Sequence, residues 1–147
     1  MDLNGLQNKV FHTRLEYLPP STNKMYVYTK RGPVPSKEMK QFKAKASIDI
    51  MKSIRLDDDE LDSNKPYALW LDIYLPKLAN KSWPKTAKTR FARRDVTNLI
   101  KVLEDVVSRG LGIDDSCFIE VHAQKIDGAK LDFTGVDVAI TELPDEY

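Results

Sequence analysis

The sequence predicts an α+β fold in which two main helices pack on a mixed β-sheet. The hydrophobic pattern alternates between a period near two and a period near 3.6, in the order strand, helix, strand, helix, strand, strand. The chain has 147 residues, a length typical of one domain with one hydrophobic core. We therefore expect a single domain over residues 1–147.

The first half of the chain predicts a strand, a helix and a second strand. Residues 10–18 are rich in apolar and β-branched side chains and stop at a Pro-Pro pair, as a strand before a rigid turn does. A connection rich in Gly and Pro follows. Residues 36–54 then carry apolar side chains at helical spacing, with Ser36 at the start. Residues 67–75 alternate and predict a strand that is buried on one face.

A second helix is the most regular element of the sequence. Asp95 or Thr97 is suited to cap its start, and Gly110 and Gly112 are suited to end it. Its apolar stripe consists of Leu99, Val102, Leu103, Val106 and Val107. This spacing predicts a helix with one face against the sheet.

Two alternating segments close the chain. Residues 118–126 and 136–142 flank a turn signal at Asp127-Gly128. We expect them to form a closing hairpin, followed by a short acidic tail over residues 143–147.

The composition excludes several classes of protein. Cys117 is the only cysteine, so neither an internal disulfide nor a cysteine-based zinc site is available. The 23 basic and 22 acidic residues give a net charge of +1, which by itself favours neither nucleic acid nor membrane. No apolar run approaches the ~20 residues of a membrane span, and no basic leader precedes an apolar stretch. We expect a cytoplasmic protein with no membrane partner.

Residues 76–94, which we name the basic loop, concentrate positive charge. They contain seven cations and no acid, so the rest of the chain carries a net charge of −6. We expect a mobile, solvated loop that meets a polyanion, because like charges repel and little of such a segment is buried. Trp83 and Phe91 lie within it, either to insert into a ligand or to fold back onto the core. The cations are Lys77, Lys81, Lys85, Lys88, Arg90, Arg93 and Arg94.

The strongest indication of chemistry lies around the second predicted helix. Each residue alone suits a structural role, as a cap, a turn or an ion pair. Together, carboxylates beside cations are what metal-assisted phosphodiester hydrolysis requires, because oxygen ligands hold Mg²⁺ and cations offset the developing charge. The residues are Arg93, Arg94, Asp95, Lys101, Asp114 and Asp115.

Asp95 and Asp115 stand at opposite ends of this helix. At ~1.5 Å per residue, their backbones lie ~20 Å apart. The connection from Gly110 to Asp114 covers at most ~18 Å when extended. A shared site therefore requires either a connection that doubles back or Asp115 from a neighbouring subunit, and the sequence leaves both routes open.

The same segment resembles the RusA family of Holliday-junction resolvases. The similarity runs from Pro19 to about Glu142. Its most specific part reads Arg94-Asp95-x-x-Asn98-x-x-Lys101-x-x-x-Asp105, then Leu111-Gly112-Ile113-Asp114-Asp115, with Pro19-Pro20-Ser21-x-Asn23 upstream. The resemblance implies a homodimeric endonuclease of bacteria and phages that uses Mg²⁺, with Mn²⁺ as a substitute, to cut four-way junctions. A twofold dimer suits paired nicks on strands related by a twofold axis.

The resemblance also implies roles for single residues. Asp95 and Asp115 correspond to metal-binding catalytic carboxylates, and Lys101 to a catalytic cation. The family pattern has a further aspartate where this chain has Thr97, which either binds the metal through its hydroxyl or a water, or caps the helix. Asp114 is available to supply the missing charge. The expected DNA contacts are Asn23, Lys85, Lys88, Arg90, Arg93, Arg94 and Asn98.

Three functions are weighed on this basis. We favour an Mg²⁺-dependent endodeoxyribonuclease that resolves Holliday junctions by paired symmetric nicks during recombination and repair. The second is a branched-DNA-binding protein with weak or no cleavage, because Thr97 replaces a carboxylate. The third is an interaction module whose basic loop binds an acidic partner. No glycine-rich phosphate loop is present, so we expect no nucleotide or other small-molecule cofactor.

Two further groups of residues suit structural roles. Five acids occupy six positions in residues 57–62, as in a solvated linker, with metal binding as the alternative. Tyr26 and Tyr28 are expected to serve packing or a dimer surface.

Overall fold

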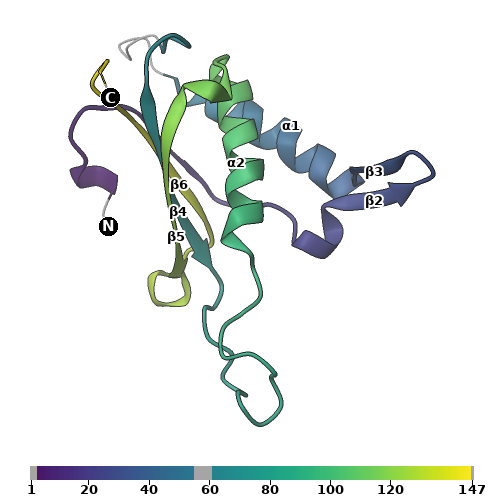
Figure 1. Ribbon diagram of the computed structural model, residues 1–147. Coiled ribbons are helices and arrows are strands. Elements are labelled where there is room, and N and C mark those ends of the chain that lie inside the picture. The colour runs from purple at the N-terminus through teal and green to yellow at the C-terminus, as the bar shows by residue number, and fades with distance from the viewer. Residues whose placement is uncertain (1–2, 55–60, 147) are drawn as a thin grey trace.

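The computed structural model describes residues 3–54 and 61–146, in which two α-helices lie on one face of a four-stranded sheet (Figure 1). Residues 57–60 of the acidic cluster and Tyr147 of the tail lie outside the described residues. The strands are β1 (Lys9–Leu15), β2 (Tyr26–Thr29), β3 (Gly32–Pro35), β4 (Tyr67–Leu75), β5 (Phe118–Asp127) and β6 (Gly135–Glu142). The helices are α1 (Lys37–Lys52) and α2 (Val96–Leu111), with short 3₁₀ turns η1 (Leu3–Gly5), η2 (Thr22–Lys24), η3 (Asp115–Cys117) and η4 (Ala129–Leu131). The expected α+β class is confirmed.

The main sheet is mixed, with strand order β1-β6-β4-β5. β6 pairs antiparallel with both β1 and β4, whereas β4 and β5 run parallel. Parallel neighbours need a crossover connection. Here the basic loop and α2 supply it, so α2 begins at the end of the sheet where β4 ends.

The expected closing hairpin is wrong, because β4 lies between β5 and β6. The turn signal at Asp127-Gly128 is present, but the chain crosses the end of β4 instead of folding back on β5. Gly128 N donates to Leu75 O at 2.7 Å. A Cβ at Gly128 would lie 2.0 Å from Phe133 O and 2.9 Å from Leu75 O, so only glycine fits this crossing.

Helix α1 begins and ends with hydroxyl side chains. Ser36 Oγ accepts a hydrogen bond from Met39 N at 3.1 Å and donates to Lys24 O, which satisfies one of the free N–H groups of the first turn. Ser53 closes the helix, so it is two residues shorter than the expected segment to Ile54. Its buried face consists of Met39, Phe42, Ala46 and Ile50.

Helix α2 confirms the predicted apolar stripe. All five stripe residues are buried, and burying a leucine such as Leu103 contributes about 1.5–3 kcal/mol. Gly112 ends the helix in the left-handed conformation, with φ of 68°, as expected of a glycine at this position. The stripe packs on Leu69, Leu71 and Ile73 of β4 within the main core.

Strand β4 was expected to be exposed on its second face, but that face is buried. Asp72 is 3% exposed and Tyr74 is 8% exposed. Long side chains of the neighbouring strands cover them, since Gln124 Nε2 donates to Asp72 Oδ1 at 2.9 Å. The Trp70 and His122 rings stack at a centroid distance of 4.0 Å. A central strand is therefore covered on both sides, although helices cover only one.

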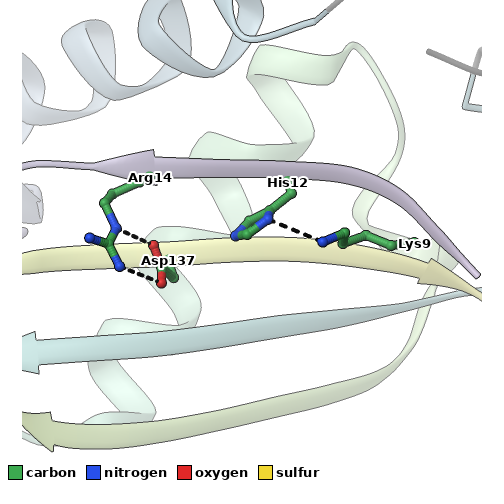
Figure 2. A network of polar contacts seen from close by, with 4 residues as sticks. All are labelled: Lys9, His12, Arg14 and Asp137. Atoms are coloured by element: carbon green, nitrogen blue, oxygen red, sulfur yellow. Dashed lines mark hydrogen bonds and ion pairs between the residues drawn. The ribbon is translucent and has the colours of Figure 1, made fainter. Parts of the chain in front are cut away.

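A charged pair completes this second face (Figure 2). Arg14 Nε and Nη2 donate to the two carboxylate oxygens of Asp137 at 2.6 and 2.9 Å, and this pairing raises the pKa of Arg14. The guanidinium lies 4.2 Å from the centroid of the Phe133 ring. Lys9 and His12 lie further along β1, with Lys9 Nζ 3.3 Å from His12 Nδ1. Bidentate geometry and ring stacking hold β1 against β6.

The Gly- and Pro-rich connection after β1 contains a second, two-stranded sheet that the sequence analysis did not predict. In it β2 and β3 pair antiparallel, with Tyr26 opposite Pro35 and Tyr28 opposite Pro33. Two prolines within four residues argued against a strand. They are tolerated because β3 is an edge strand of a sheet with only two strands.

Gly110 offers a test of the packing between the helices. A Cβ at this position would lie 2.7 Å from Ile50 Cγ2 and 2.8 Å from Ser47 O on α1. Gly110→Ala should therefore lower the free energy of unfolding by about 1–3 kcal/mol, through overpacking against backbone. Thermal denaturation measures this. Gly5→Ala is the matched control, because no atom lies within 4 Å of its Cβ. Equal melting temperatures for the two variants would contradict this packing.

Candidate nucleic-acid and metal site

The basic loop projects beyond the end of the sheet on a narrow neck (Figure 1). Ala92 N donates to Leu78 O at 2.7 Å and Asn80 N to Arg90 O at 2.8 Å. The Asn80 side-chain amide also donates to Thr89 O at 2.9 Å. These bonds pair residues 78–80 with residues 89–92. The loop is a defined arm whose tip, residues 81–88, extends from the body.

The two aromatic residues of the basic loop do not fold back onto the core. Trp83 is 44% exposed and Phe91 is 57% exposed. The Arg90 guanidinium lies 5.9 Å from the Trp83 ring and 5.3 Å from the Phe91 ring, within cation–π range. Lys85, Lys88 and Arg90 are exposed, so the arm presents cations and aromatic rings together.

The base of this arm is fixed by Arg94. Its Nη2 donates to Pro19 O at 2.8 Å, and its own carbonyl accepts from Lys125 Nζ at 3.2 Å. Burial lowers the pKa of Arg94. These contacts hold the Pro19-Pro20 segment and β5 against the start of α2. Arg93 and Asn23 are exposed.

Asp95 occupies the N-cap position of α2 but makes no capping hydrogen bond with its side chain. A helix N-terminus leaves N–H groups unsatisfied, and an Asp at this position usually accepts from one of them. Asp95 and Thr97 are exposed, and Asn98 is half-buried. The carboxylate of Asp95 is therefore available to a ligand at the foot of the basic loop.

A polar stripe runs along α2 from this end. Thr97, Lys101 and Glu104 are spaced at i, i+4 and i+7, and therefore share one face. Lys101 is exposed, and it forms no ion pair with another described residue. In particular, Lys101 does not pair with Asp105, although the i, i+4 spacing of the two residues permits an ion pair. Instead, Asp105 bridges the helices, with Oδ2 3.2 Å from Lys43 Nζ, and also pairs with Arg109.

A second acidic group lies past the other end of α2. Asp114 Oδ1 accepts a hydrogen bond from Ser116 N at 2.8 Å, which lowers the pKa of Asp114. The pKa of Glu104 is raised, first by burial and then by the charge of Asp115. The turn η3, which begins with Asp115, contacts α2.

The two ends of α2 remain separate within one protomer. Asp95 stands at the N-cap of the 16-residue α2 and Asp115 follows its other end, and a helix of this length spans about 24 Å. Mg²⁺ needs oxygen ligands at about 2.1 Å. Among residues 3–54 and 61–146, no group of three His, Cys, Asp or Glu side chains is close enough to hold a metal ion. Within the described part of one protomer, Asp95 and Asp115 therefore belong to no such group.

Two residues of this region were not expected from the sequence. Lys125 is a cation on the helix-facing side of β5, where Val121 and Ala123 are packed against the core. The sequence contains one indication of this position: Lys125 follows Val121 and Ala123 at a spacing of two residues, which places all three on one face of a strand. Glu104 was not singled out from the sequence, because the effect of the Asp115 charge on its pKa depends on the path of the chain after the helix.

The fold and charge distribution define a small α+β protein with a basic aromatic arm and a free carboxylate at its foot. The family model for endodeoxyribonuclease RusA matches residues 16–141. The chain belongs to the RusA endodeoxyribonuclease family, a family of Holliday-junction endonucleases, and the resemblance inferred from the motifs is confirmed. A search of curated proteins finds no match for this chain. In the described part of the chain, no helix is long and apolar enough to cross a membrane.

Because the Asp95 side chain makes no capping hydrogen bond, substitutions at the N-caps of α1 and α2 should lower the free energy of unfolding by different amounts. Asp95→Asn should lower the free energy of unfolding by about 0.5 kcal/mol or less, because only a charge–dipole interaction is weakened. Ser36→Ala should cost about 1–2 kcal/mol, because its hydroxyl caps α1. Urea unfolding of both variants measures the difference. A larger loss for Asp95→Asn would assign Asp95 to the fold.

Proposed function

We propose that this protein is a metal-dependent, structure-selective endodeoxyribonuclease that resolves Holliday junctions by paired symmetric nicks during recombination and repair in a bacterial cell. The observation that carries the proposal is the exposed Asp95 carboxylate, without a capping bond, at the foot of a loop with seven cations. Membership of the RusA family supports it. The partner is branched DNA, whose phosphates the cations of the loop contact.

The cations divide by position. Lys85, Lys88 and Arg90 on the arm contact phosphates away from the cut, whereas Arg93, Asn98 and Asn23 act near the foot. Arg94 contributes by holding Pro19 as well as by its charge. Lys101, exposed on the same helix as Asp95, offsets charge that develops on the phosphate.

We propose Mg²⁺, or Mn²⁺ in its place, as the metal. When bound, such an ion polarises the phosphate and lowers the pKa of a water molecule. The proposed ligands are Asp95 and Asp115, assisted by Asp114 and Thr97. These are oxygen donors, as Mg²⁺ prefers, but one protomer keeps them apart. We therefore propose that Asp95 of one protomer meets Asp115 of the partner subunit in a twofold dimer.

A second candidate, a junction-binding protein with little or no cleavage, is favoured by one observation. Thr97 is an exposed hydroxyl at the first turn of α2, where the family pattern has a third carboxylate. A neutral oxygen is a weaker ligand than a carboxylate. Binding of a four-way junction without product in Mg²⁺ would support this candidate.

The nuclease proposal predicts the loss of cleavage without the loss of binding. Asp95→Asn should reduce the rate of cutting a labelled four-way junction by at least about 100-fold in Mg²⁺, since a metal ligand is lost. Its affinity for the junction in EDTA should stay within about twofold, because the phosphate contacts remain. Glu142→Gln, an exposed carboxylate on β6, is the control with the same loss of charge. Full activity of Asp95→Asn would refute the role of Asp95.

A mixing experiment tests the shared site. Asp95→Asn and Asp115→Asn are inactive alone in this scheme. In a mixed dimer of the two variants, one site receives both native carboxylates and the other receives neither. Mixing should restore nicking of one strand but not paired cutting, as measured on a junction labelled on each strand. If the site forms within one protomer, every site in the mixed dimer carries one substitution and no nicking returns.

A further inference from the structure

The β2–β3 hairpin exposes apolar side chains that no other part of the described chain covers. Tyr28 is 83% exposed, Val27 53%, Tyr26 42% and Val34 38%. An isolated two-stranded sheet is marginally stable, and solvent-exposed apolar side chains in a group mark an interaction surface. Of the two roles expected for Tyr26 and Tyr28, packing within the chain does not agree with this exposure, whereas a dimer surface stays a prediction. Their surroundings point to a ligand.

The hairpin presents its tyrosines on one face. Residues opposite each other in an antiparallel pair share a face, so Tyr26 and Tyr28 lie with Pro35 and Pro33. The rigid proline rings restrain the backbone behind the aromatic rings. Its base is tied to α1, because Ser36 N donates to Met25 O at 2.8 Å. The tip is closed by Thr29 Oγ1, which donates to Gly32 O at 2.9 Å.

Positive charge surrounds this aromatic face. Residues 24–40 carry five cations and one acid, Glu38, a net charge of +4. All five cations are exposed, and two of them form the tip. Clustered cations with exposed aromatic rings match a polyanion that also offers flat apolar surfaces. The cations are Lys24, Lys30, Arg31, Lys37 and Lys40.

In Figure 1 the basic loop projects below the start of α2, and the hairpin projects sideways beyond the start of α1. The segment that leads to β2 is held to the start of α2 by the hydrogen bond from Arg94 to Pro19 O. Asp95 occupies the N-cap of the same helix end, at the foot of the basic loop.

We propose that the β2–β3 hairpin is a second DNA-contacting arm, in which Lys30 and Arg31 contact phosphates and Tyr28 stacks on a base-pair face exposed at the branch point. The inference rests on the proposed function, because it takes branched DNA as the ligand. A second copy of this chain fits the surface less well. In a twofold interface in which the hairpin packs on its own copy, a segment with a net charge of +4 would face its own cations.

The test measures binding in EDTA, where no cutting occurs, with a four-way junction and a linear duplex of equal length as probes. Tyr28→Ala should weaken junction binding about tenfold, because a base–aromatic stack is lost. Its duplex binding should change less than about twofold, because continuous stacking within a duplex leaves no base-pair face exposed along its length. The double variant Lys30→Ala/Arg31→Ala should weaken both and make the slope of log affinity against log salt shallower by about two.

Matched controls lie at the opposite end of the sheet. Ile119→Ala removes an apolar side chain that is 49% exposed, and Lys65→Ala removes an exposed cation. Both controls should bind the junction as the wild type does. Hairpin variants that bind like these controls would overturn the proposal. Sedimentation of Tyr28→Ala as a smaller species, with junction binding per dimer unchanged, would also overturn it by assigning the face to a second copy.

These outcomes distinguish a failure of the hairpin proposal from a failure of the nuclease proposal. Wild-type protein that cuts the junction while the hairpin variants bind it normally removes the hairpin proposal alone. The nuclease proposal alone is contradicted if the wild-type protein binds the junction through the hairpin but leaves it uncut in Mg²⁺.

Discussion

The burial of one face of α2 on the sheet is the interaction on which the rest of the molecule depends. Because β4 and β5 are parallel neighbours, the chain must travel the length of the sheet between them, and α2 makes this journey. Its apolar stripe sets which face turns to β4 and β6. Its polar stripe, with Lys101 and Glu104, consequently turns away from the core. The same burial places Asp95 and Asp115 at opposite ends of a 16-residue helix.

This arrangement explains why charged chemistry accumulates around α2. The start of α2 combines a helix dipole that favours anions with the cations of the basic loop, while Arg94 and Lys125 hold the backbone there through carbonyl oxygens. Asp95 is surplus to the stability of the helix because it makes no capping bond. Positions of this kind are free to serve a ligand, whereas Asp105, which bridges α1 and α2, serves the fold.

The two basic arms share one physical design. Each is a β-like pair held at its base by hydrogen bonds to or within a rigid element, and each displays cations beside exposed rings. Such arms bury little apolar surface in the hydrophobic core. The repulsion between their cations must therefore be offset by a ligand that neutralises the charge. A polyanion does this over many phosphates at once. A near-neutral protein thereby acquires a strongly polarised surface without a high net charge.

The sequence by itself determined the elements whose signals are local. The stripe of α2, the left-handed Gly112, the Ser36 cap and the existence of a strand over residues 67–75 depend on spacings of two to four residues, which are visible in the sequence. The RusA motif added the family. Tertiary structure alone decided that β6 lies between β1 and β4, that Asp72 is buried, and that β2 and β3 stand exposed. It also decided that Asp95 and Asp115 remain apart within a protomer. These outcomes depend on pairings between segments far apart in the chain, and their energies come from burial and geometry that no short window of sequence contains.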